Sequence, residues 1–160
     1  MRKQILKSLE KNSRFDLGEL SVCLGIPEAA VANEIADMEA EGIICGYHTL
    51  IDWEKAGEDR VNALIEVNVT PQREQGYNKT ADRICNYPEV EAVYLISGGY
   101  DYLVTMEGKT LMEVSRFISE KLSTIGDITS TRTHFILKKY KDHGQILVKR
   151  PREERMPVSL

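Results

Sequence analysis

The chain is poor in the features that mark membrane, secreted and disulfide-rich proteins. It has only three cysteines, five prolines and one tryptophan in 160 residues. No stretch approaches 18 uncharged apolar residues, which excludes a transmembrane helix. Charged side chains interrupt the first residues every few positions, so no export signal is expected. The three cysteines are odd in number and far apart, which fits free thiols in a reducing cytoplasm. We therefore expect a cytoplasmic protein.

The usual catalytic and cofactor motifs are also missing. The sequence holds no G-x-S-x-G, no P-loop and no G-x-G-x-x-G. Its histidines and cysteines do not have the spacing of zinc ligands. We therefore predict no enzyme, no catalytic residues, no metal site and no cofactor.

Positive charge is scarce except near the C-terminus. The formal net charge is -4. Residues 1–50 carry five Lys/Arg against eight Asp/Glu, and residues 51–137 carry nine against fourteen. Residues 138–160 carry seven against three. A nucleic-acid-binding protein usually presents a positive face, so the composition alone argues against one. The basic end is either a solubilising segment or a source of phosphate or subunit contacts.

Apolar residues at helical spacing predict three short helices in residues 1–50. The three stripes are Ile5, Leu6 and Leu9, then Leu17, Leu20, Val22 and Leu24, then Val31, Ile35 and Met38. Asp16 is an N-cap candidate, Gly25 ends the second helix, and Pro27 suits the first turn of the third. An apolar run at 43–47 predicts a strand. Three helices followed by a strand are typical of a winged helix-turn-helix.

Residues 51–60 are polar and are predicted to be a hinge. From 61 to 141 the pattern predicts a ferredoxin-like β-α-β-β-α-β unit, so the fold class is α/β in the α+β sense. The expected strands cover 61–69, 90–97, 102–107 and 128–139, and the expected helices cover 72–87 and 110–125. Such a sheet leaves one face open, which favours self-association. Residues 142–160 form a basic tail, either an added edge strand or a partner-dependent arm.

Several short motifs, in this order and spacing, identify a family. They are Leu24-Gly25-Ile26, Gly42-Ile43-Ile44, the run Ser97-Gly98-Gly99-Tyr100-Asp101-Tyr102-Leu103, and Thr131-Arg132-Thr133. With the two-part organisation, they resemble the Lrp/AsnC, or feast/famine, transcription regulators. The resemblance implies a homodimer or higher even oligomer that binds double-stranded DNA through its helix-turn-helix. It also implies a small-molecule effector, an amino acid or similar compound, bound between dimers.

A glycine-rich loop is the candidate effector site. Gly98 and Asp101 match the Gly-x-x-Asp motif of the family. A zwitterion needs N–H donors for its carboxylate and an anion for its ammonium, and the loop offers both. The alternative is a plain hairpin turn that Asp101 caps. The predicted effector-binding residues are Gly98, Gly99, Tyr100, Asp101, Thr131 and Thr133.

The third helix is acidic where the resemblance implies basic residues. Residues 27–42 contain five Asp/Glu and no Lys or Arg. One hypothesis keeps weak, salt-sensitive DNA binding. Phosphates are contacted by Arg2, Lys3, Lys7, Lys11 and Arg14, and base edges by Ala29, Ala30 and Asn33. The other is an effector-binding assembly or partner protein whose helix has lost DNA binding. The predicted DNA-binding residues are Arg14, Glu28, Ala29, Ala30, Asn33, Glu34 and Asp37.

Overall fold

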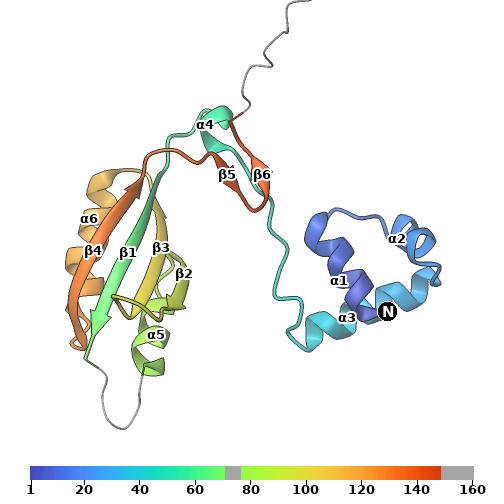
Figure 1. Cartoon of the computed structure of the whole chain (residues 1–160), viewed down its shortest axis with the longest axis horizontal. Helices are drawn as coiled ribbons and strands as arrows, with labels where there is room; N and C mark the ends of the chain where they lie inside the picture. Colours follow the sequence, from blue (N-terminus) through green and yellow to red (C-terminus); the bar gives the residue numbers. More distant parts are fainter. Residues whose placement is uncertain (71–76, 149–160) are drawn as a thin grey trace, which may run out of the picture. The chain divides into compact units, whose positions relative to one another are not determined.

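The computed structural model describes residues 1–70 and 77–148, and it divides into two compact units, Met1–Leu50 and Ile51–Leu160. The first unit contains three helices, α1 (Arg2–Lys11), α2 (Leu17–Leu24) and α3 (Glu28–Ala40) (Figure 1). Its core is small: Ile5, Leu20, Val31 and Met38 are completely or almost completely buried. The apolar stripes thus meet in one core, as helical spacing predicts.

Capping residues set the limits of these helices. The Asp16 carboxylate accepts hydrogen bonds from the backbone N–H groups of Gly18 and Glu19, at 2.8 and 3.4 Å, and so begins α2. Gly25 ends α2 with φ of 66°, a conformation that costs other residues more. Gly25 therefore sets a tight turn between α2 and α3, as a helix-turn-helix requires.

The predicted strand at 43–47 does not form. The backbone N–H groups of Ile43 and Ile44 both donate to the carbonyl of Met38, which closes the end of α3 instead. A strand needs a neighbour to satisfy its backbone groups, and the described part of the first unit contains no other strand. The first unit is therefore a helix-turn-helix without the expected wing strand.

Two side chains of the predicted stripes, Leu17 and Val22, are exposed, and Val22 far more than Leu17. Val22 is 83% exposed, although it was grouped with Leu20. The two residues are two positions apart and therefore roughly 200° apart around the helix, so both cannot face the same core.

The second unit has the predicted β-α-β-β-α-β order. Its elements are β1 (Val61–Val69), α5 (Asn78–Cys85), β2 (Val90–Leu95), β3 (Tyr102–Gly108), α6 (Leu111–Glu120), a 3₁₀ turn (Leu122–Thr124) and β4 (Ile128–Ile136). The strands form one antiparallel sheet in the order β2-β3-β1-β4 (Figure 1). This is the ferredoxin-like arrangement, with β1 at the centre between β3 and β4.

The two faces of the sheet differ in burial. Ala63, Ile65, Val67 and Val69 of β1 are buried with Ile84 of α5 and with Val114 and Phe117 of α6. The opposite face carries Glu66, which lies 3.0 Å from His134 and 3.7 Å from Arg132. Because the helices cover only one face, the other is available for the self-association that the sequence predicts.

Residues 51–60 contain a short helix, α4 (Trp53–Ala56), capped by Asp52. The Arg60 guanidinium lies 3.4 Å from the centre of the Trp53 ring and pairs with Glu107 of β3. These contacts place the predicted hinge segment against the end of the sheet. Its role as a hinge stays a prediction.

The chain after β4 forms a hairpin of β5 (Lys141–Asp142) and β6 (Gln145–Ile146). Its turn uses positive φ at His143 and Gly144. The hairpin is a separate two-stranded sheet, so the described part of the tail does not add an edge strand to the main sheet. The rest of the predicted basic tail, residues 149–160, lies outside the described residues.

Across the described residues, every helix is too short or too polar to span a bilayer.

Candidate functional site

An arginine at the start of α1 neutralises part of the acidic third helix. Arg2 Nε lies 2.7 Å from Glu34 Oε2, and its two terminal nitrogens lie 2.8 and 3.0 Å from the Glu41 carboxylate. The pairing with Arg2 holds the pKa of Glu41 below its usual value. Arg2 was predicted to contact phosphates. It is instead engaged within the first unit, because two carboxylates of α3 and its C-cap lie beside it.

A third acid of this helix is also occupied. The Tyr47 hydroxyl donates a hydrogen bond of 2.7 Å to Glu39 Oε1. This bond raises the pKa of Tyr47, because ionising the phenol would destroy the donor beside a carboxylate. Glu34, Glu39 and Glu41 therefore all have partners from the same unit.

The outward face of α3 is small and uncharged at its centre. Ala29, Asn33, Ala36 and Ala40 are exposed and follow one another at four-, three- and four-residue intervals, which places them on one side of the helix. Glu28 and Asp37 lie beside this row, exposed and without an ion pair among the described residues. The third helix thus presents Asn33 in a strip of alanines.

The predicted DNA-binding residues divide into two groups. Arg14, Glu28, Ala29, Asn33 and Asp37 are exposed. Ala30 and Glu34 are half-buried, and Glu34 faces α1 through Arg2 rather than the outward side of α3. Glu34 is thus an ion-pair partner inside the unit, and its role in DNA binding stays a prediction.

A row of lysines on α1 provides positive charge in this unit. Lys3, Lys7 and Lys11 are exposed and lie at four-residue intervals, so they share one face of α1. None of them has an ion pair among the described residues. Arg14 follows in the connection to α2 and is also exposed. These four groups remain available for phosphate oxygens.

At the loop between β2 and β3, Asp101 is bound to the neighbouring strand. Its Oδ2 accepts a 2.8 Å hydrogen bond from the backbone N–H of Val69, and its Oδ1 lies 3.4 Å from the Tyr77 hydroxyl. Its own N–H donates to the carbonyl of Val67 at 3.1 Å. The carboxylate thus binds the backbone at the end of β1, a neighbouring strand, whereas the alternative for this loop had Asp101 capping its own turn. Among residues 1–70 and 77–148, its second oxygen has only the long contact to Tyr77.

The two glycines of this loop are not required by the backbone. Positive φ occurs at Gly25, Gly42, Gly57 and Gly144, but not at Gly98 or Gly99. A Cβ at Gly99 would meet nothing within 4 Å, and one at Gly98 would meet only Ile96, at 3.6 Å. Local folding therefore does not explain the glycines. A close approach by another molecule would, because a side chain there would block it.

The remaining predicted effector residues lie at the same end of the sheet. Val67 pairs with Tyr102 on one side and with Thr131 on the other, so these residues form one row across β3, β1 and β4. Adjacent strands are about 4.8 Å apart, which places Tyr102 and Thr131 roughly 10 Å apart. Thr131, Thr133 and Tyr100 are half-buried. The structure thus brings the loop and the threonines to one end of the sheet, separated by β1.

Sequence reasoning missed the residues that connect these groups. Tyr77 contacts Asp101, and its carbonyl accepts a hydrogen bond from the buried Tyr102 hydroxyl. Arg2 forms ion pairs with acids 32 and 39 positions away, and Tyr47 donates a hydrogen bond to an acid 8 positions away. Local pattern carries no signal for such pairs; only the excess of acids in residues 27–42 indicated that partners were needed.

Comparison with known proteins gives consistent results. The profile of the family described as the Lrp/AsnC ligand binding domain matches residues 62–146. The chain is 44% identical over 157 residues to an HTH-type transcriptional regulator of Bacillus subtilis, YugG, covering 98% of this chain and 95% of that protein.

Two solved structures have the same fold. The chain matches LrpC of Bacillus subtilis with a TM-score of 0.63 and 26% identity, over 88% of this chain and 94% of LrpC. It matches a transcriptional regulator of Neisseria meningitidis, NMB0573, in complex with L-methionine, with a TM-score of 0.70 and 23% identity. That match covers 88% of this chain and 90% of the other.

Proposed function

Because this chain belongs to the Lrp/AsnC family of transcription regulators, we propose that it binds operator DNA with residues 1–50 and a small-molecule effector with residues 61–141. It acts as a homodimer or a higher even oligomer. We further propose that it works in the cytoplasm as a regulator rather than as an enzyme. The three free cysteines suit that reducing compartment.

The observation that carries DNA binding is the uncharged row of Ala29, Asn33, Ala36 and Ala40 along the exposed side of α3, with Glu28 and Asp37 beside it. Five acids in one recognition helix would be repelled by phosphates. Three of them are held by Arg2 and Tyr47, and the exposed centre of the helix is Asn33 among alanines. Asparagine can read adenine and alanine can meet a thymine methyl. Lys3, Lys7 and Lys11 supply the phosphate contacts that α3 lacks.

The direct test is a titration of the full chain against its own promoter region and against random DNA at low salt. We expect binding to both, tighter for the promoter, with affinity that falls steeply as salt rises. The second hypothesis, an assembly that has lost DNA binding, predicts no binding to either DNA by intact oligomers. That result would remove the DNA-binding proposal.

An amino acid is the effector class that the loop at 98–101 suits best. Within the described residues, the N–H groups of Gly98 and Gly99 donate no backbone hydrogen bond and can face a carboxylate, and Asp101 provides negative charge beside them. The related regulator of Neisseria meningitidis holds L-methionine. Effector binding would then favour one assembly over another and change the spacing of the paired N-terminal units.

Replacing Asp101 separates the effector role from the structural one. Asp101→Asn keeps an oxygen that can accept from Val69 N–H but loses the charge, whereas Asp101→Ala loses both. We expect both variants to stay dimeric and to bind the effector at least about tenfold more weakly, since a charge-assisted hydrogen bond is lost. Only the alanine variant should also melt at a lower temperature. Calorimetric titration and thermal denaturation measure the two effects. Undiminished effector response in Asp101→Asn would show that this pocket is assigned wrongly.

A further inference from the structure

Exposed positive charge gathers in one part of the second unit, the chain that follows β4. Residues 51–137 carry nine Lys/Arg against fourteen Asp/Glu, whereas residues 138–148 carry three Lys against one Asp. Lys138, Lys139 and Lys141 are all exposed. The sequence keeps the same excess in residues 149–160, with four Lys/Arg against two Asp/Glu. The second unit thus has a basic segment, residues 138–148, attached to a body with an excess of acids.

The acid within the basic segment already has partners. Asp142 Oδ2 lies 3.6 Å from Lys139 Nζ, and Asp142 Oδ1 lies 2.9 Å from His143 Nδ1. Lys138 and Lys141 have no ion pair or side-chain hydrogen bond within the described ranges, 1–70 and 77–148. Two ammonium groups therefore remain for the anions of another molecule.

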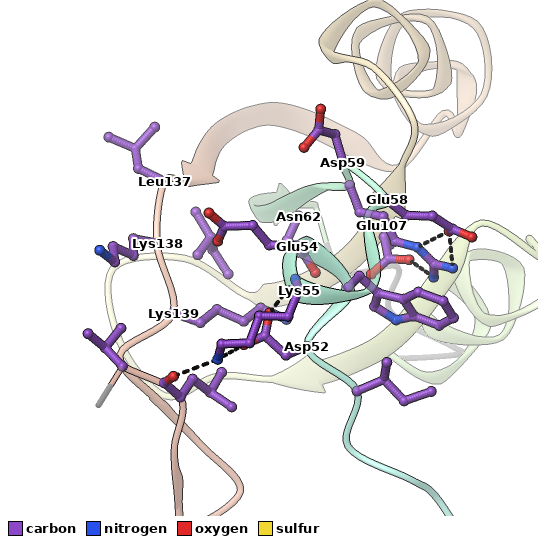
Figure 2. Close-up of a pocket in the computed structure, with 16 residues that line it drawn as sticks. Asp52, Glu54, Lys55, Glu58, Asp59, Asn62, Glu107, Leu137, Lys138 and Lys139 are labelled. Carbon is purple, nitrogen blue, oxygen red and sulfur yellow. Dashed lines mark hydrogen bonds and ion pairs between the residues drawn. The ribbon is translucent and has the colours of Figure 1, made fainter. Parts of the chain in front are cut away.

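The direction of the Lys138 side chain suits an outside partner. In Figure 2 it points away from the pocket that lies between α4 and the basic segment. Its ammonium lies 5.5 Å from the centre of the Tyr140 ring, a contact that leaves the N–H groups able to donate. Tyr140 is itself 68% exposed. Both side chains are therefore at the surface, where a large molecule can reach them.

Lys141 lies on a narrow ribbon formed by β5 and β6. Lys141 pairs with Ile146, and Asp142 with Gln145, in an antiparallel sheet that is separate from the main one. Residues 143 and 144 close the ribbon with positive φ, which gives a tight turn. A two-stranded ribbon is narrow enough to enter the major groove of DNA. The shape of the ribbon is therefore compatible with a duplex.

The base of the ribbon is held to α4. Lys55 Nζ donates a hydrogen bond of 2.9 Å to the carbonyl of Leu147, whose own N–H donates to the carbonyl of Tyr140 at 3.0 Å. Figure 1 shows β5 and β6 beside α4, which begins three residues after Leu50, the last residue of the first unit. Because this contact holds the ribbon in place, less conformational freedom is lost when it binds a partner.

The arrangement of charge on the ribbon favours DNA over a membrane or an acidic protein surface. Opposite residues of an antiparallel pair share a face, so Lys141 and Ile146 lie on the same side of the ribbon. A membrane-surface element instead separates an apolar face from a basic one. On a second copy, three acids of the segment 27–42 already have partners in their own unit. A duplex offers closely spaced phosphates, which suit unpaired ammonium groups.

We propose that the basic segment is a second DNA-contacting element, in which Lys138 and Lys141 bind phosphates of the duplex. This rests on the proposed function, since it adds contacts to DNA that residues 1–50 already bind. The added contacts are to the backbone, so they strengthen binding to any sequence.

Salt-dependent DNA binding by the full chain tests this element. The probe is labelled DNA, either a fragment of its own promoter region or a random fragment of equal length, followed by fluorescence anisotropy. For Lys138→Gln combined with Lys141→Gln, we expect affinity about tenfold to a hundredfold lower at about 0.1 M salt, on both fragments. The dependence of log affinity on log salt concentration should become shallower by roughly 0.9 for each lost contact.

Lys79→Gln combined with Lys109→Gln is the matched control. Both lysines are exposed in the second unit and lie outside the basic segment, so this variant loses the same charge. It should bind DNA as the original chain does, because salt screens charges that do not contact the duplex. Sedimentation velocity and thermal denaturation check that both variants assemble and fold alike.

Photo-crosslinking reports the contact directly. p-Benzoylphenylalanine in place of Tyr140, which lies beside Lys138 and next to Lys141 in the chain, should crosslink to the labelled fragment. In place of Tyr94, which is 53% exposed on β2, it should not.

The outcomes separate this proposal from the proposed function. Absence of DNA binding by the original chain would remove both. If the original chain binds DNA and the Lys138/Lys141 variant binds equally well, only the basic segment is assigned wrongly. Weaker binding without a crosslink from position 140 would mean an indirect effect and would also overturn the proposal.

Two further results would assign the lysines to another partner. Weaker DNA binding together with loss of the oligomer would place them in a contact between copies of the chain. Binding to vesicles containing phosphatidylserine that is lost in the Lys138/Lys141 variant, with its DNA binding intact, would place them on a membrane surface.

Discussion

Ile5→Ala is expected to unfold residues 1–50 and to leave the second unit folded. Ile5 is completely buried in a core with only three other buried residues, Leu20, Val31 and Met38. Replacing a buried isoleucine by alanine lowers the free energy of unfolding by about 2–5 kcal/mol. A unit of this size has only a marginal surplus of stability, so the loss is comparable with its whole free energy of unfolding. DNA binding should disappear, whereas self-association and effector binding should persist, because residues 61–125 have a separate core.

Amide hydrogen exchange, resolved by peptide, measures this effect. Peptides from α1, α2 and α3 should lose protection, while those from β1 and β3 should keep it. Val22→Ala is the matched control, because Val22 lies in the same unit and is 83% exposed. Equal loss of protection in both units would contradict the expectation, since it would mean that the two cores unfold together.

Changing the three lysines of α1 together is expected to have the second large effect. In the variant Lys3→Gln, Lys7→Gln, Lys11→Gln, each lost phosphate contact makes the dependence of log affinity on log salt concentration shallower by roughly 0.9. Three contacts correspond to a loss of about two to three orders of magnitude in DNA affinity at 0.1 M salt. Because phosphates carry no sequence information, binding to promoter and to random DNA should weaken alike.

Fluorescence anisotropy with labelled DNA over a range of salt concentrations measures both quantities. Lys79→Gln combined with Lys109→Gln is the control, because these exposed lysines lie in the second unit. If the triple variant kept the salt dependence of the original chain, α1 would not contact phosphates. Another basic segment would then have to supply the charge.

The regular elements could be predicted from sequence because each depends on local pattern. The expected strand at 61–69 forms, with alternate residues buried, and the expected helix at 110–125 is present as α6, capped by Thr110. The pairing of strands followed from their order, since few topologies accommodate β-α-β-β-α-β. The strand at 43–47 failed for the opposite reason. Its apolar pattern was suitable, but a strand also needs a partner, and the local sequence does not reveal whether one is present.

The site could be predicted only in part because charges act across long sequence separations. The sequence shows the five acids of residues 27–42, but it does not show that three of them are bound by Arg2 and Tyr47. The same applies to Asp101, whose residue type suits both a ligand anchor and a strand cap. Only the distance of 2.8 Å to Val69 N–H shows that one of its oxygens is already used.

The ion pairs of Arg2 with Glu34 and Glu41 affect how this regulator can be re-engineered. A chimera that takes only residues 27–42 would carry the acids without the guanidinium, which lies on another helix. Such a chimera would approach DNA with uncompensated negative charge. If it did not bind DNA, that result would say nothing about the bases that Asn33 reads. Residues 1–50 should therefore be exchanged as one block, with Met1 directly ahead of Arg2 and no fusion partner crowding that end.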